Sequence, residues 1–213
     1  MAEPRPALPF ATFAQQEHAA RLGMMVFLAS EALLFAALFA LHAAYRATYP
    51  AAFASGVAHS TRALGSINTA VLLTSSYAAA SSLHALRAGR RARSLGLLAL
   101  TVALGAAFLA IKLTEYARHL GEGIDPAGHG RFFVAHPEAG LRTFWTLYYV
   151  TTGLHAAHVT IGLAVLAWMA VRVALGGVSA ERSHPLELGV LYWHLVDIVW
   201  IFVWALYYLA GGG

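Results

Sequence analysis

The sequence contains no cysteine and few charged residues. Of its 213 residues only 11% are charged, whereas 59% are hydrophobic. The lack of cysteine excludes disulfides, thiolate metal centres and cysteine nucleophiles together. A soluble domain usually carries about 25% charged residues, so the low charge predicts an integral membrane protein. The net charge is +4. In a membrane protein an excess of Lys and Arg usually sets the orientation in the membrane, so we expect no nucleic-acid partner.

Five apolar stretches are long enough to cross a hydrocarbon core, which takes about 20 helical residues. We therefore predict an all-α integral membrane protein whose single domain, 21–213, is a bundle of five transmembrane helices. Residues 1–20 contain three prolines and are expected to form an N-terminal arm. The loop 119–142 is expected to be rich in turns. The predicted spans lie near 21–45, 64–87, 94–118, 143–172 and 187–210.

Arginines indicate the orientation of the bundle. Arg87, Arg90, Arg91 and Arg93 lie close together between the second and third predicted spans. Loops rich in Lys and Arg stay on the cytoplasmic side of a membrane. With five spans, this loop places the N-terminus inside and the C-terminus outside. Aromatic residues near the span ends are typical of interfacial belts, and they include Trp145, Tyr148, Tyr149, Tyr207 and Tyr208.

Ionisable residues interrupt otherwise apolar spans. His155 and His158 lie in the fourth span, and His194 and Asp197 lie in the fifth. Each such group costs roughly 2.5–3.5 kcal/mol at bilayer depth, so it should face protein, lipid head groups or water. A rise of about 1.5 Å per residue puts all four, with Glu31 of the first span, in the middle-to-inner layer. This common depth predicts a shared site or a polar seam.

Several functions are compatible with these groups. The simplest is hydrogen bonding between helices, worth about 0.6 kcal/mol per contact. Lipid binding or proton-related chemistry is the functional alternative. His-x-x-His alone is a weak metal signal because a tetrahedral site needs three or four ligands. A haem carrier would need axial histidines on facing helices, such as His155 or His158 opposite His194. A di-iron enzyme would need several histidine clusters, whereas this sequence has only His155-x-x-His158 and isolated histidines. A transporter would need an inverted repeat or a pair of broken helices, and we find neither in the sequence.

Other polar residues in the spans have narrower interpretations. Glu31 has no basic neighbour within a turn. Unless Arg or His from another helix pairs with it, burial favours its protonated form, as in proton relays. Lys112 and Glu115 are three residues apart and are expected to form a local, structural ion pair. Asn68 and Thr69 are expected to cap a helix or to bond between helices.

Taken together, the spans resemble the cytochrome c oxidase subunit 3 family, which is subunit III of the haem-copper respiratory oxidases. The matching stretches come from all five spans in the family's order. By this resemblance the five spans correspond to the last five of the family's seven-helix form, as in its five-helix bacterial members. The stretches are FLASEALLF (27–35), INTAVLLTSS (67–76), IKLTEY (111–116), TTGLHAAHVTIG (151–162) and YWHLVDIVWIF (192–202).

The resemblance implies an accessory, non-catalytic subunit of a terminal oxidase in the bacterial inner (plasma) membrane. Haem and copper would belong to partner subunits, the catalytic subunit I and subunit II, and not to this chain. The family also implies bound phospholipid and support of proton uptake. Glu31 matches its intramembrane carboxylate, and His155, His158, His194 and Asp197 match polar positions of its last two helices. Cytochrome c oxidase is the expected complex, with quinol oxidase and nitric oxide reductase as alternatives.

Overall fold

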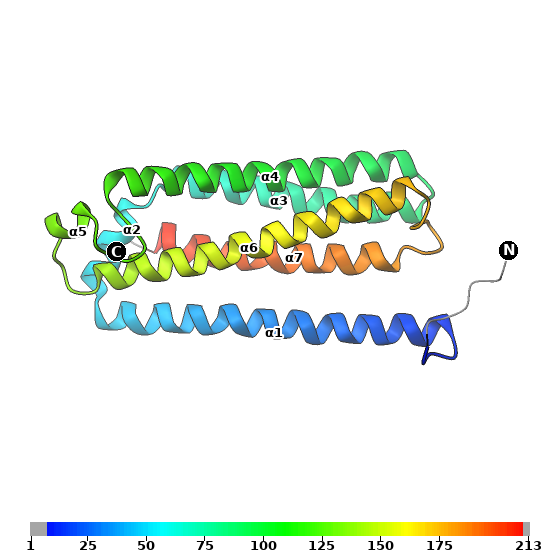
Figure 1. Ribbon diagram of the computed structural model, residues 1–213, viewed down its shortest axis with the longest axis horizontal. Helices are drawn as coiled ribbons and strands as arrows, with labels where there is room; N and C mark the ends of the chain where they lie inside the picture. Colours follow the sequence, from blue (N-terminus) through cyan, green and yellow to red (C-terminus); the bar gives the residue numbers. More distant parts are fainter. Residues whose placement is uncertain (1–7, 211–213) are drawn as a thin grey trace.

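The computed structural model describes residues 8–210, and these form an all-helical bundle without strands (Figure 1). Long helices run side by side, and two short helices and a π-helical segment lie at one end. The all-α prediction is therefore confirmed. In chain order the elements are α1 (Phe13–Thr48), α2 (Pro50–His59), α3 (Arg62–Arg87), α4 (Arg91–Glu122), α5 (Arg131–Ala135), α6 (Leu141–Ala174), α7 (His184–Trp204) and the π-helical segment η1 (Ala205–Leu209).

The bundle has two distinct ends (Figure 1). One end holds the start of α1 and the α3–α4 and α6–α7 connections, and it is called the arginine end below. The other end holds α2, α5 and η1 and is called the α2–α5 end.

Among residues 8–210, four helices are long and apolar enough to cross a membrane: α1, α4, α6, and α7 together with η1. The helix α3, with 26 residues, is long enough but is less apolar. Its polar side chains explain the difference, because Asn68, Thr69, Ser75 and Ser82 are buried against other helices. The structure thus supports an integral membrane protein, with four of the five predicted spans recovered by length and composition.

The first helix begins earlier than the predicted span. It starts at Phe13, so the end of the predicted arm is helical. The reason is a local N-terminal cap: Thr12 Oγ1 accepts a hydrogen bond from the backbone N–H of Gln15. In turn, Gln15 Oε1 accepts a hydrogen bond from the backbone N–H of Ala11 at 3.1 Å. Residues 1–7 of the predicted arm lie outside the described residues.

The two short helices were not predicted. Pro50 begins α2, where a missing N–H costs nothing and the fixed φ suits a helix. Helix α5 lies within the loop 119–142, which was expected to be rich in turns. Its buried residues Phe132 and Phe133 anchor that loop on the bundle.

Close packing of α4, α6 and α7 centres on Trp193, whose side chain is fully buried. A Cβ placed at Gly162 of α6 would lie 2.7 Å from this indole ring, and one at Gly105 of α4 would lie 2.8 Å from it. Both glycines therefore make room for the indole. Its Nε1 donates a hydrogen bond to Ser75 Oγ of α3 at 3.2 Å, which adds a fourth helix to the contact.

Helix α1 lies at the edge of the bundle (Figure 1). Within the described helix only Phe35 and His42 are buried. Lipid tails are as apolar as leucine, so apolar side chains alone do not drive a helix onto its neighbours in a membrane. Polar contacts and packing must hold α1 in place.

Three polar contacts hold α1, one near each end and one in the middle. At the arginine end, Arg21 pairs with Glu187 of α7 at 2.9 Å. In the middle, Glu31 meets His158 of α6 at 2.8 Å. At the α2–α5 end, Arg46 donates to the Ala210 carbonyl at 2.5 Å.

The Trp193 packing predicts a difference between two glycines of α6. We expect Gly162→Ala to destabilise the bundle by about 1–3 kcal/mol, because the new methyl overlaps a buried ring. Gly153→Ala is the matched control, since the nearest atom to its new Cβ is 3.9 Å away. It should leave stability unchanged or raise it by up to about 1 kcal/mol. Thermal unfolding in mild detergent measures both, and equal midpoints would contradict the packing argument.

Candidate functional site

Glu31 and His158 form a carboxyl–imidazole contact between α1 and α6. His158 Nε2 lies 2.8 Å from Glu31 Oε2, and His158 Nδ1 lies 2.8 Å from the Leu154 carbonyl oxygen. A carbonyl only accepts, so Nδ1 carries a hydrogen. The Glu31 contact then holds one further proton, either on the carboxyl group or on the imidazole. This pairing supplies the partner that the sequence of α1 lacks, and it places both groups at one depth, as predicted.

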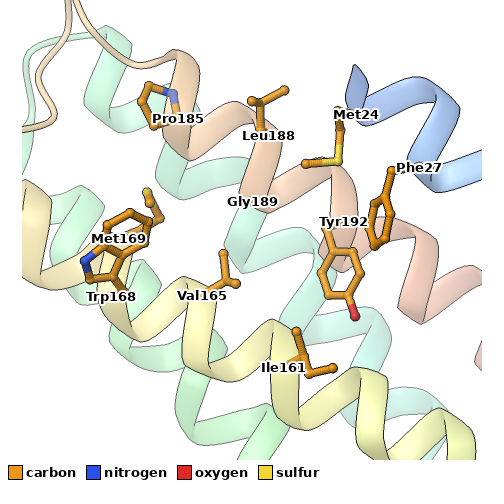
Figure 2. A pocket seen from close by; sticks show the side chains of 10 residues that line it. All are labelled: Met24, Phe27, Ile161, Val165, Trp168, Met169, Pro185, Leu188, Gly189 and Tyr192. Carbon is orange, nitrogen blue, oxygen red and sulfur yellow. The ribbon is translucent and has the colours of Figure 1, made fainter. Parts of the chain in front are cut away.

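An apolar groove of about 380 Å³ lies between α1, α6 and α7 on the arginine-end side of this contact. Figure 2 shows Met24 and Phe27 of α1 facing Tyr192 of α7, with Ile161 and Trp168 of α6 across the groove. The Phe27 and Tyr192 rings stack with centroids 6.0 Å apart. The Tyr192 hydroxyl donates to the His158 carbonyl at 3.2 Å, so the groove borders the Glu31–His158 contact.

His155 occupies a different environment although it shares a helix face with His158. Its ring is 1% exposed and lies among aromatic rings. The centroid distances are 5.2 Å to Trp200, 5.6 Å to Phe108 and 6.3 Å to Phe35. Neither ring nitrogen has a hydrogen-bond partner within residues 8–210. His155 is thus an unpaired polar group inside an aromatic box.

His194 and Asp197 face α3 instead of α6. His194 Nδ1 lies 2.7 Å from Ser76 Oγ. Asp197 is 3% exposed and interacts with the same Ser76, although neither of its oxygens forms a hydrogen bond of ordinary geometry in the described part of the chain. Within residues 8–210, no hydrogen bond or ion pair joins these two groups to His155 or His158.

A second polar cluster surrounds Lys112 and Glu115 of α4. The ion pair expected from the sequence is present, with Lys112 Nζ 3.0 Å from Glu115 Oε2. It is also fully buried, with side chains 2% and 0% exposed. Lys112 Nζ further contacts the hydroxyls of Tyr148 and Tyr208 at 2.8 and 2.6 Å. The same hydroxyls donate to Glu115 at 2.9 and 3.0 Å, so both charges are fully hydrogen-bonded.

The π-helical segment η1 positions one wall of this cluster. It brings Tyr208 onto Lys112 and Glu115, while Tyr207 bonds Thr151 of α6 at 3.0 Å. Single π-turns are rare and often occur at functional sites. Trp145, Tyr148, Tyr207 and Tyr208 were expected to belong to an interfacial belt. The structure instead buries all four inside the bundle, since each is 0% exposed.

Asn68 and Thr69 bond between helices, as one of the two alternatives predicted. Asn68 Nδ2 reaches the Phe108 carbonyl of α4 at 3.5 Å. Thr69 Oγ1 accepts a hydrogen bond from Trp200 Nε1 of α7 at 3.0 Å. Neither caps α3, which begins at Arg62.

No group of three or more His, Cys, Asp or Glu side chains that could hold a metal ion occurs among residues 8–210. Apart from His155 in its aromatic box, the ionisable groups singled out in the spans separate into three places. These are the Glu31–His158 contact, the α3-facing pair His194 and Asp197, and the Lys112–Glu115 cluster. Each place joins helices that are distant in the sequence.

Comparison with known proteins identifies the family. The model of the family Cytochrome c oxidase subunit III matches residues 11–212, which is nearly the whole chain. The chain belongs to this family. The resemblance carried by the five sequence motifs is thereby confirmed, and the chain is a subunit III of the haem-copper oxidase type.

Relatives of this subunit III carry two kinds of name. Cytochrome c oxidase subunit 3 of a Synechocystis species is 32% identical over 190 residues, covering 88% of this chain and 74% of the relative. Quinol oxidase subunit 3 of Bacillus subtilis is 29% identical over 194 residues, covering 90% and 87%. Probable quinol oxidase subunit 3 of Staphylococcus haemolyticus is 28% identical over 193 residues, covering 90% and 89%.

The buried ion pair predicts a strong effect of removing one charge. Lys112→Met leaves the Glu115 carboxylate buried without its counter-ion, which should cost about 3–5 kcal/mol of stability. The double variant Lys112→Met/Glu115→Met should recover part of this loss because no charge is left unpaired.

Arg118→Gln on the same helix is the control for charge removal. Arg118 pairs with Glu122, but their side chains are 59% and 44% exposed, so little change is expected. The unfolding midpoint of the purified subunit in detergent measures all three variants. If Lys112→Met and Arg118→Gln lowered it equally, burial of the pair would have no energetic role.

Proposed function

We propose that this chain is the accessory, non-catalytic subunit III of a terminal oxidase of aerobic respiration in a bacterial plasma membrane. The observation that carries the proposal is the family match over residues 11–212. Relatives that cover about 90% of the chain come from bacteria. Haem and copper then belong to the partner subunits I and II, and this chain stabilises the catalytic subunit.

We further propose five membrane spans with the N-terminus inside and the C-terminus outside. The helix α3 is the span that composition alone does not recover. Its 26 residues are enough for a crossing, and it runs along α4 (Figure 1). Its buried polar side chains bond to α4 and α7, so they need not face lipid.

Glu31 and His158 are the residues that we propose for a proton-related role. The contact holds one proton that either group can carry, and the two side chains are only 18% and 12% exposed. Both are held by rigid helices, and His158 is oriented by the Leu154 carbonyl. Such a pair can take up and release a proton without moving the backbone. We propose the same lipid- or proton-related role for His155, His194 and Asp197. Both ring nitrogens of the buried His155 lack a hydrogen-bond partner within the described range, which costs stability and so does not indicate a structural role.

The apolar groove between α1, α6 and α7 suits a phospholipid acyl chain. Its lining is apolar, with residues such as Phe27 and Trp168, and it lies within helices apolar enough to span a membrane (Figure 2). Arg21 and Glu187 pair near the groove's arginine end, where a head group would meet water. An acyl chain there would fill the space between α1 and the rest of the bundle.

For the electron donor we propose cytochrome c, in line with the cytochrome c oxidase expected from the family resemblance. The relative named cytochrome c oxidase subunit 3 has 32% identity to the chain. Quinol is the second candidate, favoured by relatives named quinol oxidase subunit 3 at 28–29% identity.

Purification through a tag on this chain tests the assignment. We expect a haem-containing complex with an oxidase spectrum, which consumes oxygen with reduced cytochrome c and not with a quinol. Quinol-driven oxygen consumption would transfer the proposal to the second candidate. A chain that is recovered from native membranes without any haem-bearing partner would refute the accessory role.

Replacing Glu31 by Gln tests the proton-related role. Gln keeps the size of the side chain and can still bond His158, but it cannot exchange a proton. We expect an assembled complex whose oxygen consumption is slower or fades sooner during turnover. Glu122→Gln is the control, because Glu122 is an exposed carboxylate on α4. Unchanged rate and persistence in the assembled Glu31→Gln complex would remove the proposed role.

A further inference from the structure

The four arginines of the α3–α4 connection have different environments. Arg87 bonds Glu187 at 2.6 Å and Ser183 at 3.2 Å. Arg91 donates to the Ala174 carbonyl. Both tie this connection to the α6–α7 connection. The remaining two, Arg90 and Arg93, instead line a hollow on the surface.

This hollow, called the Arg90–Arg93 pocket, has a volume of about 400 Å³. His84 and Ser81 of α3 complete its polar lining. In the part of the chain that the structure describes, no hydrogen bond or ion pair is formed by the side chains of Arg90, Arg93, His84 or Ser81. The pocket therefore gathers two cations, an imidazole and a hydroxyl that have no protein acceptor.

The pocket continues into an apolar surface along α3. Tyr77, Ser81 and His84 are spaced four and three residues apart, so they share one helix face. At about 1.5 Å per residue, Tyr77 lies about 10 Å deeper in the bundle than His84. Tyr77 is 76% exposed, and Leu73, one turn further, is 50% exposed. A ligand that matches this surface is anionic at the arginine end and apolar towards the middle.

We propose that the Arg90–Arg93 pocket binds the head group of an anionic phospholipid, whose acyl chain follows Tyr77 and Leu73. Basic pockets at the cytoplasmic ends of membrane helices suit such head groups, and each Lys or Arg contributes about 1 kcal/mol near the surface. The site is formed by α3 and the start of α4, so it is separate from the apolar groove of α1, α6 and α7. It does not depend on which oxidase the chain serves.

Lipid binding to the purified, delipidated complex tests the proposal. The probes are detergent micelles containing phosphatidylglycerol or, for comparison, phosphatidylcholine, and the readouts are retained lipid by mass analysis and the unfolding midpoint. We expect phosphatidylglycerol alone to be retained and to raise the midpoint. The variant Arg90→Gln/Arg93→Gln should weaken its binding about 30-fold, which is two contributions of about 1 kcal/mol each.

Two further variants separate charge in the pocket from charge in general. Arg90→Lys/Arg93→Lys keeps two phosphate-binding cations and should retain most of the affinity. Arg62→Gln/Arg142→Gln removes two positive charges near the α2–α5 end, at the starts of α3 and α6, and should change nothing.

Four outcomes would overturn the proposal. Equal retention of phosphatidylcholine would show that charge is not recognised, and an unchanged Arg90→Gln/Arg93→Gln variant would place the lipid elsewhere. Displacement of the lipid by inorganic phosphate at equal concentration would assign the pocket to a free anion. Loss of a partner subunit from the Gln variant would assign it to an acidic protein segment. Each readout is measured on the purified complex, so the test of lipid binding is independent of the electron donor that the complex uses.

Discussion

The buried ion pair of Lys112 and Glu115 constrains the whole α2–α5 end of the bundle. In a hydrocarbon environment neither charge is tolerable unless every donor and acceptor is bonded. Tyr148 and Tyr208 supply the missing bonds, so α6 and η1 must meet α4 at one register. The π-turn of η1 holds two successive buried tyrosines, of which Tyr208 contacts the ion pair and Tyr207 bonds Thr151.

Helix α1, unlike the helices around the ion pair, is held mainly by polar contacts and not by extensive packing. It buries little of its surface and is fixed at Arg21, Glu31 and Arg46. The Glu31–His158 contact links α1 to α6, and it is the contact for which we propose a proton-related role. The apolar groove beside it exists because these ties hold α1 without closing the space between helices.

Sequence reasoning located most of the polar groups but not their partners. The depth estimate brought Glu31 level with His158, and the two are in contact. It also suggested one site for His155, His158, His194 and Asp197, whereas the fold turns them towards different neighbours. The rotation of each helix about its axis decides this, and span-end aromatics such as Tyr148 and Tyr208 were missed for the same reason. Burial of their hydroxyls against α4 leaves no periodic signal in the sequence.

The sequence by itself determined the all-helical class, the extent of the long helices, the family and the polar positions, because apolar length and local motifs are properties of contiguous residues. Tertiary structure alone decided that Lys112 and Glu115 are enclosed by two tyrosines and that Glu31 pairs with His158. It also divided the arginines of one loop between Glu187, a backbone carbonyl and an open pocket. Those outcomes depend on which faces of distant helices meet. Within a membrane, hydrogen bonds and close packing determine these faces more than hydrophobicity does.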